Sequence, residues 1–485
     1  MEVLKSNFYN VLIPVNEENE FLLYNTLSGG LIILSSEQGD YLQRIIDEKI
    51  HVVLDDLAKN AFLSGLFEQD FLIVSDRDEQ QEFYDYYNKA KEFLYERSYG
   101  DLAFTIGTTI TCNMGCPYCF EFIKPNKTFK DEANIAALLY YIKDVMAKAP
   151  IKTWRSLNIT WYGGEPMINS AAIEKITPLL LEVCEQNNMS YSASIITNGL
   201  LLDEKGWDVL VRNKVTTAQV TIDGPEELHN VKRPLKVNKG ENYTKILKNL
   251  SKIPDGIVVT IRINVDKKIA ASLGRFMDDL YDYGIWPQKY QSFDFNAAWL
   301  RDYNEIHSDV VSEFLTNEEF FEVNESFRRD RLYRFNSWAE QDNLPKAKLK
   351  WQLPSLVQDC STWVSPYNIV IDPEGYIQKC WETIHDEKEH IKHLFDGFEV
   401  STYSKYMEFD KTNLHNDCRV CQYLPICDKL PCAKETVKPI KPPCTYWKEK
   451  LPSSFKNQYI LSKHHPEIMT FPVLNAQVNT GHSLK

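Results

Sequence analysis

"TITCNMGCPYCFEFI", residues 109–123, places three cysteines, Cys112, Cys116 and Cys119, within eight residues. The apolar run before it, "DLAFTIGTTI" (101–110), predicts a buried β-strand, so the cysteines lie in the loop that follows a strand. Three thiolates in such a loop can bind one face of a four-iron cluster and leave one iron open to activate a substrate. A zinc site is the alternative, but zinc takes four ligands, and His229 or another cysteine would have to supply the fourth.

The sequence on either side of this loop alternates between short β-rich runs and helical patterns. Together with 101–110, the predicted strands are 156–164, 191–199, 216–224, 256–266 and 291–298, and helices are predicted near 131–148, 171–188, 204–213, 241–252 and 270–283. Six βα units in series predict an α/β fold with a parallel sheet, either an open doubly wound sheet or a partial (β/α)6 barrel. In both, chemistry belongs at the carboxyl ends of the strands, where the cysteine loop, "GGEP" (163–166), "TNG" (197–199) and "DGP" (223–225) are expected.

Composition limits the classes of protein to consider. The chain of 485 residues is long enough for several domains, and its net charge of −14 argues against nucleic-acid or anionic-membrane partners. No apolar run is long enough to span a bilayer, and the N-terminus has no signal-peptide layout, so we expect a cytoplasmic protein. Clustered cysteines in a reducing compartment predict metal ligands rather than disulfides. Cys184, which stands alone in an apolar helical pattern, is expected to be a buried hydrophobic residue.

Changes of pattern divide the chain into five predicted segments. In 1–95, "FYNVLIPV" and "EFLLYNTLSGGLIIL" predict two strands around a turn, followed by helices and a last short strand, a winged-helix-like order. The barrel occupies 101–300, and a charged, aromatic helical linker occupies 301–355. Residues 356–450 carry seven cysteines and many prolines, so we expect this domain to need metal clusters for stability. Residues 451–485 are a polar tail.

The cysteine motif, with aromatic Tyr118 before the last cysteine, resembles the signature of the radical S-adenosylmethionine (SAM) superfamily, and "GGEP" resembles that family's second motif. The resemblance covers about 101–300. It implies that the open iron binds SAM, and that one electron from the reduced cluster cleaves SAM to methionine and a 5′-deoxyadenosyl radical, which abstracts hydrogen from an unactivated C–H bond. It also implies an electron donor such as flavodoxin or ferredoxin.

The resemblance assigns several residues to SAM. Gly163 and Gly164 permit close backbone approach, and Glu165 accepts hydrogen bonds from the methionine ammonium group. The remaining expected contacts are Tyr118 near the adenine, Thr197 and Asn198 at the ribose or carboxylate, and Arg262 with Asn264. Arg262 and Asn264 alternate with isoleucines, which puts both on one face of their strand, and a buried arginine needs an anionic partner such as the SAM carboxylate or a structural ion pair.

The C-terminal cysteines resemble the SPASM extension of radical SAM enzymes, which holds two auxiliary four-iron clusters, making three [4Fe–4S] clusters in all. By that resemblance, one auxiliary cluster would be bound by Cys418, Cys421, Cys427 and Cys444, and the other by Cys360, Cys380 and Cys432. Cys432 follows a spacing of four residues where the family usually has three. A pair of zinc sites is the alternative.

SPASM enzymes commonly modify peptides, and the N-terminal module resembles the element with which peptide maturases capture a precursor's leader by β-augmentation. We therefore expect a ribosomally made precursor peptide as substrate, and crosslinks from cysteine sulfur to carbon, since an open auxiliary iron can hold a thiolate. Carbon–carbon crosslinking and sulfatase maturation to formylglycine remain alternatives. Sulfatase-maturing relatives carry an aspartate where this chain has Trp381, although Glu382 follows it. A zinc-binding interaction protein is the alternative from a different class.

Overall fold

The computed structural model describes residues 2–96, 99–119, 121, 126–129, 132–237, 242–300, 313–356, 360–407, 414–427 and 444–472. The chain divides into two compact units. Unit 1 comprises Met1–Glu92, Asp342–Cys360 and Phe409–Lys485, and unit 2 comprises Phe93–Gln341 and Ser361–Glu408. No helix in the described ranges is both long and apolar enough to cross a bilayer.

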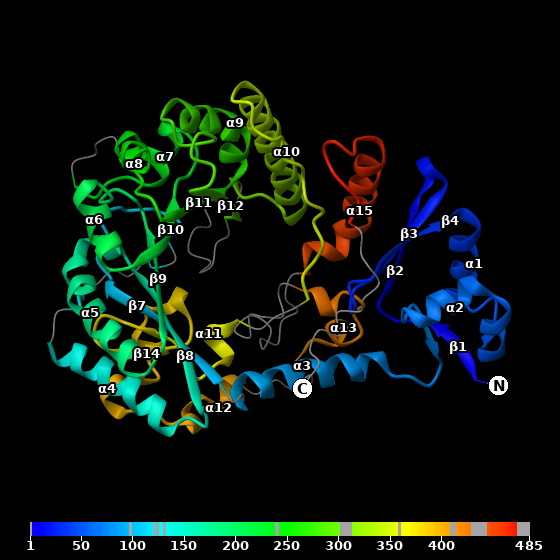
Figure 1. Ribbon diagram of the computed structural model, residues 1–485, viewed down its shortest axis with the longest axis horizontal. Helices are drawn as coiled ribbons and strands as arrows, with labels where there is room; N and C mark the ends of the chain where they lie inside the picture. Colours follow the sequence, from blue (N-terminus) through cyan, green and yellow to red (C-terminus); the bar gives the residue numbers. More distant parts are fainter. Residues whose placement is uncertain are drawn as a thin grey trace. The chain divides into compact units, whose positions relative to one another are not determined.

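Unit 2 is built on a nine-stranded, mostly parallel sheet with the order β12-β11-β10-β9-β8-β7-β13-β14-β15. Strands β7 to β12 are mutually parallel and lie in chain order, as a partial (β/α)6 barrel requires (Figure 1). All six predicted strands are thus confirmed. They are β7 (Tyr99–Thr109), β8 (Thr153–Gly163), β9 (Ser190–Thr197), β10 (Val215–Thr221), β11 (Val258–Val265) and β12 (Phe293–Trp299).

Helices connect these strands and lie along the sheet (Figure 1). Aspartates begin two of them: the side chain of Asp203 accepts a hydrogen bond from the backbone N–H of Gly206, and Asp266 accepts one from Ile269. Cys184 is 3% exposed on the sheet-facing side of α5, as predicted. The connecting helices are α4 (Glu132–Lys148), α5 (Ser170–Gln186), α6 (Glu204–Arg212), α7 (Glu226–Lys232), α8 (Asn242–Leu250) and α9 (Lys267–Asp282). Helix α10 (Asn317–Gln341) follows β12 and packs against α9.

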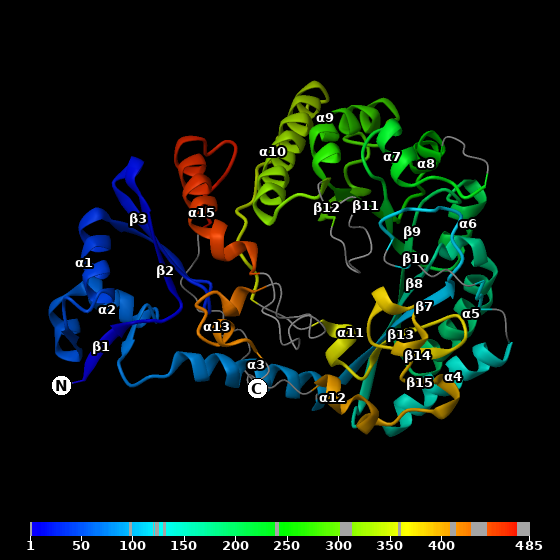
Figure 2. The ribbon, with the colours of Figure 1, turned by 180° about the vertical axis from the view of Figure 1, so that it is seen from behind.

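A segment from the predicted C-terminal domain extends the same sheet. Strand β13 (Asn368–Ile371) pairs in parallel with β7, and β14 (Tyr376–Gln378) and β15 (Lys392–His393) continue the sheet in antiparallel fashion (Figure 2). The hydroxyl groups of Tyr141 on α4 and Tyr403 are hydrogen-bonded at 2.7 Å in the core. Residues 361–408, which include the short helices α11 (Ser361–Val364) and α12 (Ser404–Met407), therefore belong to the barrel unit.

The N-terminal part of unit 1 has two three-stranded sheets, of order β5-β1-β6 and β2-β3-β4. The predicted single strand over 20–34 is instead a hairpin, because the Asn25 side chain accepts hydrogen bonds from the N–H groups of Leu27 and Ser28 and Gly29 takes a left-handed φ of 73°. The elements are β1 (Val3–Ser6), β2 (Asn10–Val15), β3 (Glu20–Asn25), β4 (Leu31–Ser35), α1 (Ser36–Ile46), β5 (Val52–Val53), α2 (Ala61–Glu68), β6 (Leu72–Val74) and α3 (Glu79–Glu96).

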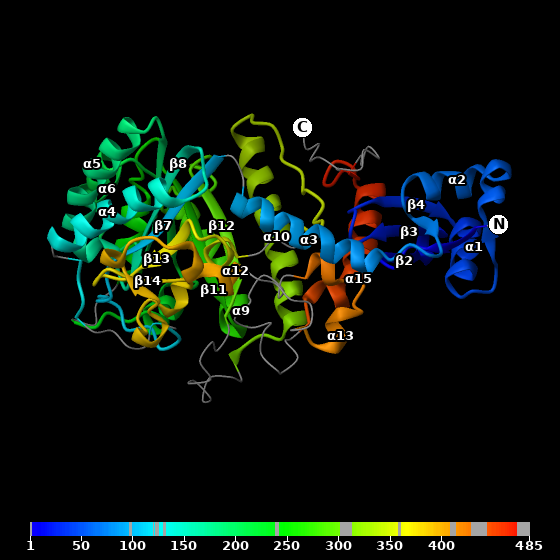
Figure 3. The ribbon, with the colours of Figure 1, turned by 90° about the horizontal axis from the view of Figure 1, so that it is seen from below.

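The rest of unit 1 comes from the other end of the chain. Helix α15 (Tyr446–His464) packs beside β2 and β3 (Figure 3), and Phe455 meets Tyr24 edge to face at 4.9 Å. Two lysines of α15 form ion pairs with the N-terminal segment, Lys456 with Glu17 at 2.8 Å and Lys463 with Glu20 at 2.6 Å. Helix α13 (Asn416–Arg419) lies in the same unit. Residues predicted as one domain, 356–450, are therefore divided between the units, and part of the predicted tail is a packed helix.

Candidate active site

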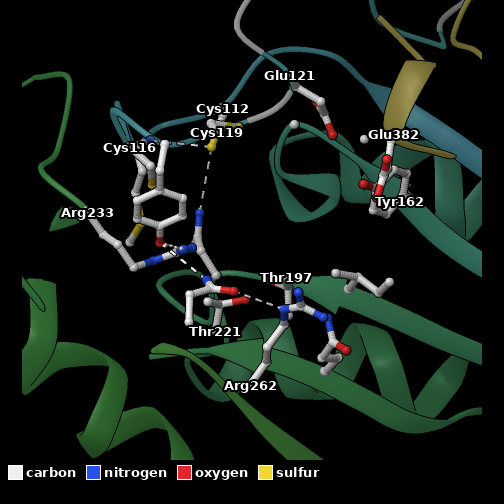
Figure 4. Close-up of a pocket in the computed structure, with 18 of the residues that line it drawn as sticks. Cys112, Cys116, Cys119, Glu121, Tyr162, Thr197, Thr221, Arg233, Arg262 and Glu382 are labelled. Atoms are coloured by element: carbon white, nitrogen blue, oxygen red, sulfur yellow. Dashed lines mark hydrogen bonds between the residues drawn. The ribbon is translucent and has the colours of Figure 1, made fainter. Parts of the chain in front are cut away.

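The carboxyl ends of β7 to β12 surround one cavity, with a free volume of about 1180 Å³ that includes its open mouth (Figure 4). Each of these six strands, or the residues that follow it, contributes to the wall, together with Trp381 and Glu382 after β14. This is where a parallel α/β sheet places its chemistry. Most of the residues predicted for cluster and SAM lie here: Cys112, Cys116, Tyr118, Cys119, Gly163, Gly164, Thr197, Asn198, Arg262 and Asn264.

The three cysteines of the loop after β7 line the cavity, and among the described residues none of them forms a disulfide. The N–H of Met114 points at the Cys112 sulfur, 3.4 Å away. Burial raises the pKa of Cys116 to about 11, and the charge of Arg233 opposes that rise. Because a thiol must lose its proton to bind iron, a cationic metal group would offset this rise at Cys116.

"GGEP" fastens the cysteine loop to the end of β8. The N–H of Gly164 donates to Thr109 at 2.9 Å, and the N–H of Glu165 donates to Thr111 at 3.0 Å. A Cβ on Gly163 would lie 2.1 Å from the Thr109 carbonyl oxygen, and Gly163 has a left-handed φ of 116°. The close approach that the two glycines permit is therefore between the two strand ends.

Glu165 is fully buried and lies behind the cavity wall, not in its lining. Its carboxylate accepts hydrogen bonds from the Thr197 hydroxyl at 2.7 Å, the N–H of Asn198 at 2.7 Å and the N–H of Met167 at 3.1 Å. Burial raises the pKa of Glu165, and these hydrogen bonds oppose the rise. The carboxylate thus joins two strand ends, and its contact with the SAM ammonium group stays a prediction.

Thr197 and Asn198 line the cavity at the end of β9. The Asn198 amide donates to the Asn113 side chain at 2.7 Å, which ties "TNG" to the cysteine loop. Arg262 and Asn264 face the cavity from β11, as their alternation predicts, and the Arg262 Nε donates to the Asn264 amide oxygen at 3.2 Å. Among the described residues Arg262 forms no ion pair, so the predicted structural partner is not present there.

A second segment that pairs with the cysteine loop was not predicted from the sequence. Residues 233–236 run alongside the cysteine loop, with the N–H of Gly115 donating to Pro234 at 2.8 Å and that of Lys236 to Asn113 at 3.0 Å. Arg233, which is 9% exposed, donates from Nη1 to the Tyr118 hydroxyl at 2.8 Å. No local pattern in "HNVKRPLK" marks this pairing, because it joins segments more than a hundred residues apart.

Tyr118 lies at the centre of a buried polar network. Its hydroxyl donates to the carboxylate of Asp223, whose other oxygen accepts the N–H of Asn264 at 3.0 Å. The N–H of Asp223 donates to Nδ1 of His229 at 3.1 Å, so that ring nitrogen carries no proton, and burial lowers the pKa of His229. Burial alone would lower the pKa of Arg233, but its anionic neighbours hold it above its ordinary value. The "DGP" at the end of β10 supplies the network's carboxylate.

A second group of side chains lines the cavity around Tyr162, away from Arg233 in Figure 4. Burial raises the pKa of Tyr162, and the negative charges of Glu121, Cys119 and Glu382 add to the rise. The Trp381 ring lies 6.0 Å from that of Tyr162. Sequence reasoning named Trp381 and Glu382 only as a departure from a family pattern, and it missed Tyr162 and Glu121.

The predicted auxiliary ligands fall in both units. Cys380 follows β14 in unit 2, whereas Cys360, Cys418, Cys421, Cys427 and Cys444 belong to unit 1, and Cys432 lies outside the described residues. Cys418, Cys421 and Cys427 pack against an aromatic cluster that includes Tyr9, Phe83, Tyr84 and Tyr87. Within the described ranges no three His, Cys, Asp or Glu side chains converge on a single metal ion. A cubane cluster binds each thiolate at a different iron and does not need such convergence.

Known proteins with similar sequences include members of one enzyme superfamily. Residues 106–269 match the model of the radical SAM superfamily. Two similar sequences are a serine-type anaerobic sulfatase-maturating enzyme from Klebsiella aerogenes (21% identical over 65% of this chain and 76% of the relative) and the radical SAM cyclopropyl synthase TigE from Paramaledivibacter caminithermalis (24% over 50% of this chain and 55% of the relative).

A solved structure shares the fold. It is native anSMEcpe with bound AdoMet and the Cp18Cys peptide, which aligns with a TM-score of 0.52 and 16% identity over 74% of this chain and 97% of that one. The family match covers β7 to the start of α9, the part of the barrel that carries the cysteine loop, "GGEP", "TNG" and "DGP". The chain therefore contains a radical SAM domain, within residues 106–269.

Proposed function

We propose that the protein is a maturase that uses SAM to modify a peptide or protein substrate. The observation that carries the proposal is a cavity in which three cysteines of one loop lie together with polar side chains from the ends of neighbouring strands. When bound there, a [4Fe–4S] cluster and SAM would supply a 5′-deoxyadenosyl radical. Cys112, Cys116 and Cys119 would hold the cluster.

The cavity's polar groups suit the rest of SAM. Arg262 faces it without an ionic partner among the described residues, and the buried Nε of Arg233 has no hydrogen-bond acceptor there. A buried, unsatisfied guanidinium N–H is costly, and an anionic ligand such as the SAM carboxylate would satisfy it. Thr197, Asn198, Tyr118 and Asn264 add hydrogen-bonding groups, and Gly163 and Gly164 present backbone at the cavity wall.

The N-terminal module supports a peptide substrate. In the described residues β4 pairs only with β3, so one edge of the β2-β3-β4 sheet is open to an added strand. We propose that the leader of a precursor peptide binds there by β-augmentation. Ile33 on β4 is 42% exposed, and Ile46 on α1, at 38%, is a matched control. Ile33→Lys should weaken binding of a labelled leader peptide in fluorescence polarisation, and Ile46→Lys should not. Equal loss in both variants would refute this site.

The modification we favour is a thioether from cysteine sulfur to carbon. Its support is the set of C-terminal cysteines, of which Cys360, Cys380 and Cys432 would leave one iron of their cluster open for a substrate thiolate. Anaerobic reaction with the precursor peptide, followed by mass spectrometry, tests this proposal. Each link should remove two hydrogens and one alkylatable thiol. The same mass loss with all thiols still alkylatable would mean carbon–carbon crosslinks.

Sulfatase maturation is the second candidate. It is favoured by the sulfatase-maturating relatives and by Glu382, which faces the cavity although Trp381 occupies the aspartate position of that group. A peptide carrying a sulfatase's target cysteine or serine should then gain an aldehyde that reacts with a hydrazide probe. Aldehyde formation without any crosslinked product would replace the thioether proposal by this one.

A further inference from the structure

We propose that Arg233 tunes the reduction potential of the cluster held by Cys112, Cys116 and Cys119, as a positioning residue that fixes one positive charge beside the cysteine loop. The inference rests on the radical SAM domain and is independent of which substrate is modified. Neither the cysteine motif nor "GGEP" contains this residue, which follows the end of α7.

The backbone fixes Arg233 relative to the loop. The hydrogen bonds from Gly115 to Pro234 and from Lys236 to Asn113, together with the β-bridge between Met114 and Leu235, make residues 233–236 a short antiparallel partner of the loop. Asn242 donates to the Arg233 carbonyl at 2.6 Å from the next helix. The position of the side chain is therefore set by main-chain pairing rather than by a flexible surface loop.

The guanidinium is buried, and its Nη1 contacts two side chains of the network. Its Nη1 donates to the Tyr118 hydroxyl at 2.8 Å, between Cys116 and Cys119 in sequence, and lies 3.8 Å from the Asp223 carboxylate. Asp223 is itself fully buried and fixed by Asn264. Arg233 lines the same cavity as the three cysteines, beside Cys116 in Figure 4, and its charge opposes the rise that burial gives to the pKa of Cys116.

Charge then determines the direction of the effect. One-electron reduction of the cluster, by dithionite or a low-potential protein donor, adds one negative charge to a group already bound by thiolates. A fixed cation stabilises the reduced state more than the oxidised state, and low dielectric strengthens the interaction. Arg233 therefore raises the potential and eases reduction, while Asp223, an anion in the same network, lowers it. The two side chains predict shifts of opposite sign.

The experiment is an EPR-monitored redox titration of the full-length, anaerobically purified protein without SAM. The cluster to follow is the one whose EPR signal changes when SAM is added afterwards. Arg233→Gln should shift its midpoint potential to more negative values, and Asp223→Asn should shift it to more positive values. Arg233→Lys, which keeps the charge, should stay near wild type.

Arg331→Gln is the matched control, because Arg331 is another largely buried arginine of unit 2, packed over the rings of Phe295 and Phe327 and absent from the cavity lining. It should leave the potential unchanged. Wild-type potentials in both Arg233→Gln and Asp223→Asn, at full iron content, would overturn the proposal, as would shifts of the same sign in both. If Arg233→Gln fails to retain iron, Asp223→Asn decides: a positive shift supports the proposal, and an unchanged potential overturns it.

Discussion

Gly164 should be irreplaceable by alanine, for a reason that is purely steric. A Cβ at this position would lie 2.2 Å from the Ile110 carbonyl oxygen and 2.6 Å from that of Thr111. Both are backbone atoms, so no side chain can rotate away to make room. The alanine variant must push the end of β8 from the end of β7 and break the hydrogen bonds from Gly164 to Thr109 and from Glu165 to Thr111.

The cost can be worked from these contacts. Two backbone hydrogen bonds contribute about 1 kcal/mol each, and forced overpacking adds about 1–3 kcal/mol. Local opening of this junction should therefore become easier by about 3–5 kcal/mol, since the terms act on the same two strand ends. At about 1.4 kcal/mol per factor of ten, amide exchange at 164–165 should accelerate at least ~100-fold.

Hydrogen-exchange mass spectrometry of peptides covering 160–168 measures this directly, with Gly274→Ala on α9 as the control. The added Cβ of that variant meets only the tip of Arg334, at 3.6 Å, so helix α9 should be unchanged or slightly more stable. The Gly164→Ala variant should also lose iron more readily, because the cysteine loop begins at the displaced strand end. Wild-type exchange rates at 164–165 would refute the steric argument.

Three further predictions follow from single contacts. Tyr141→Phe leaves the buried Tyr403 hydroxyl without its partner and should cost about 1–3 kcal/mol in chemical denaturation of unit 2, while the double phenylalanine variant recovers part of the loss. If the Glu165 carboxylate joins the strand ends, Glu165→Gln should change the affinity for SAM little but accelerate amide exchange at 197–199. An unchanged exchange rate would mean that this carboxylate serves only to bind SAM. Hydrogen bonds from His464 and Lys463 lower the pKa of Glu18 in the folded protein. These contacts therefore stabilise α15 above the pKa that Glu18 has in the unfolded chain, and the stabilisation is lost as the pH falls through the lowered pKa of the folded state. Limited proteolysis of α15 should increase only in acid, and a pH-independent rate would contradict this.

The barrel was predictable because its signals are local. Apolar β-rich runs such as 101–110 and 256–266 are bounded by helical periodicity, and each structural strand lies within a few residues of its prediction. The cysteine spacing and the alternation around Arg262 identify side chains that share a loop or a face, which needs no knowledge of the tertiary fold. The cavity residues that belong to these local patterns could therefore be predicted from the sequence.

What escaped prediction depends on contacts between distant segments. The pairing of 233–236 with the cysteine loop, and the entry of Trp381 and Glu382 into the cavity, arise only when the barrel forms. Glu165 belongs to a motif that resembles a ligand site, yet its carboxylate accepts a hydrogen bond from the residue that follows the neighbouring strand β9. The division of 356–450 follows from β13 pairing with β7, a register that composition does not encode.

We propose that Cys112, Cys116 and Cys119 hold the cluster that cleaves SAM. The most direct test of this proposal is the formation of 5′-deoxyadenosine from SAM by the anaerobic, reconstituted protein under strong reductant. The wild type and Cys184→Ala, which removes the buried cysteine of α5 outside the cavity, should form it. The triple variant Cys112→Ala, Cys116→Ala and Cys119→Ala should not. Undiminished 5′-deoxyadenosine from the triple variant, or a colourless wild-type protein that contains zinc and no iron, would contradict the account.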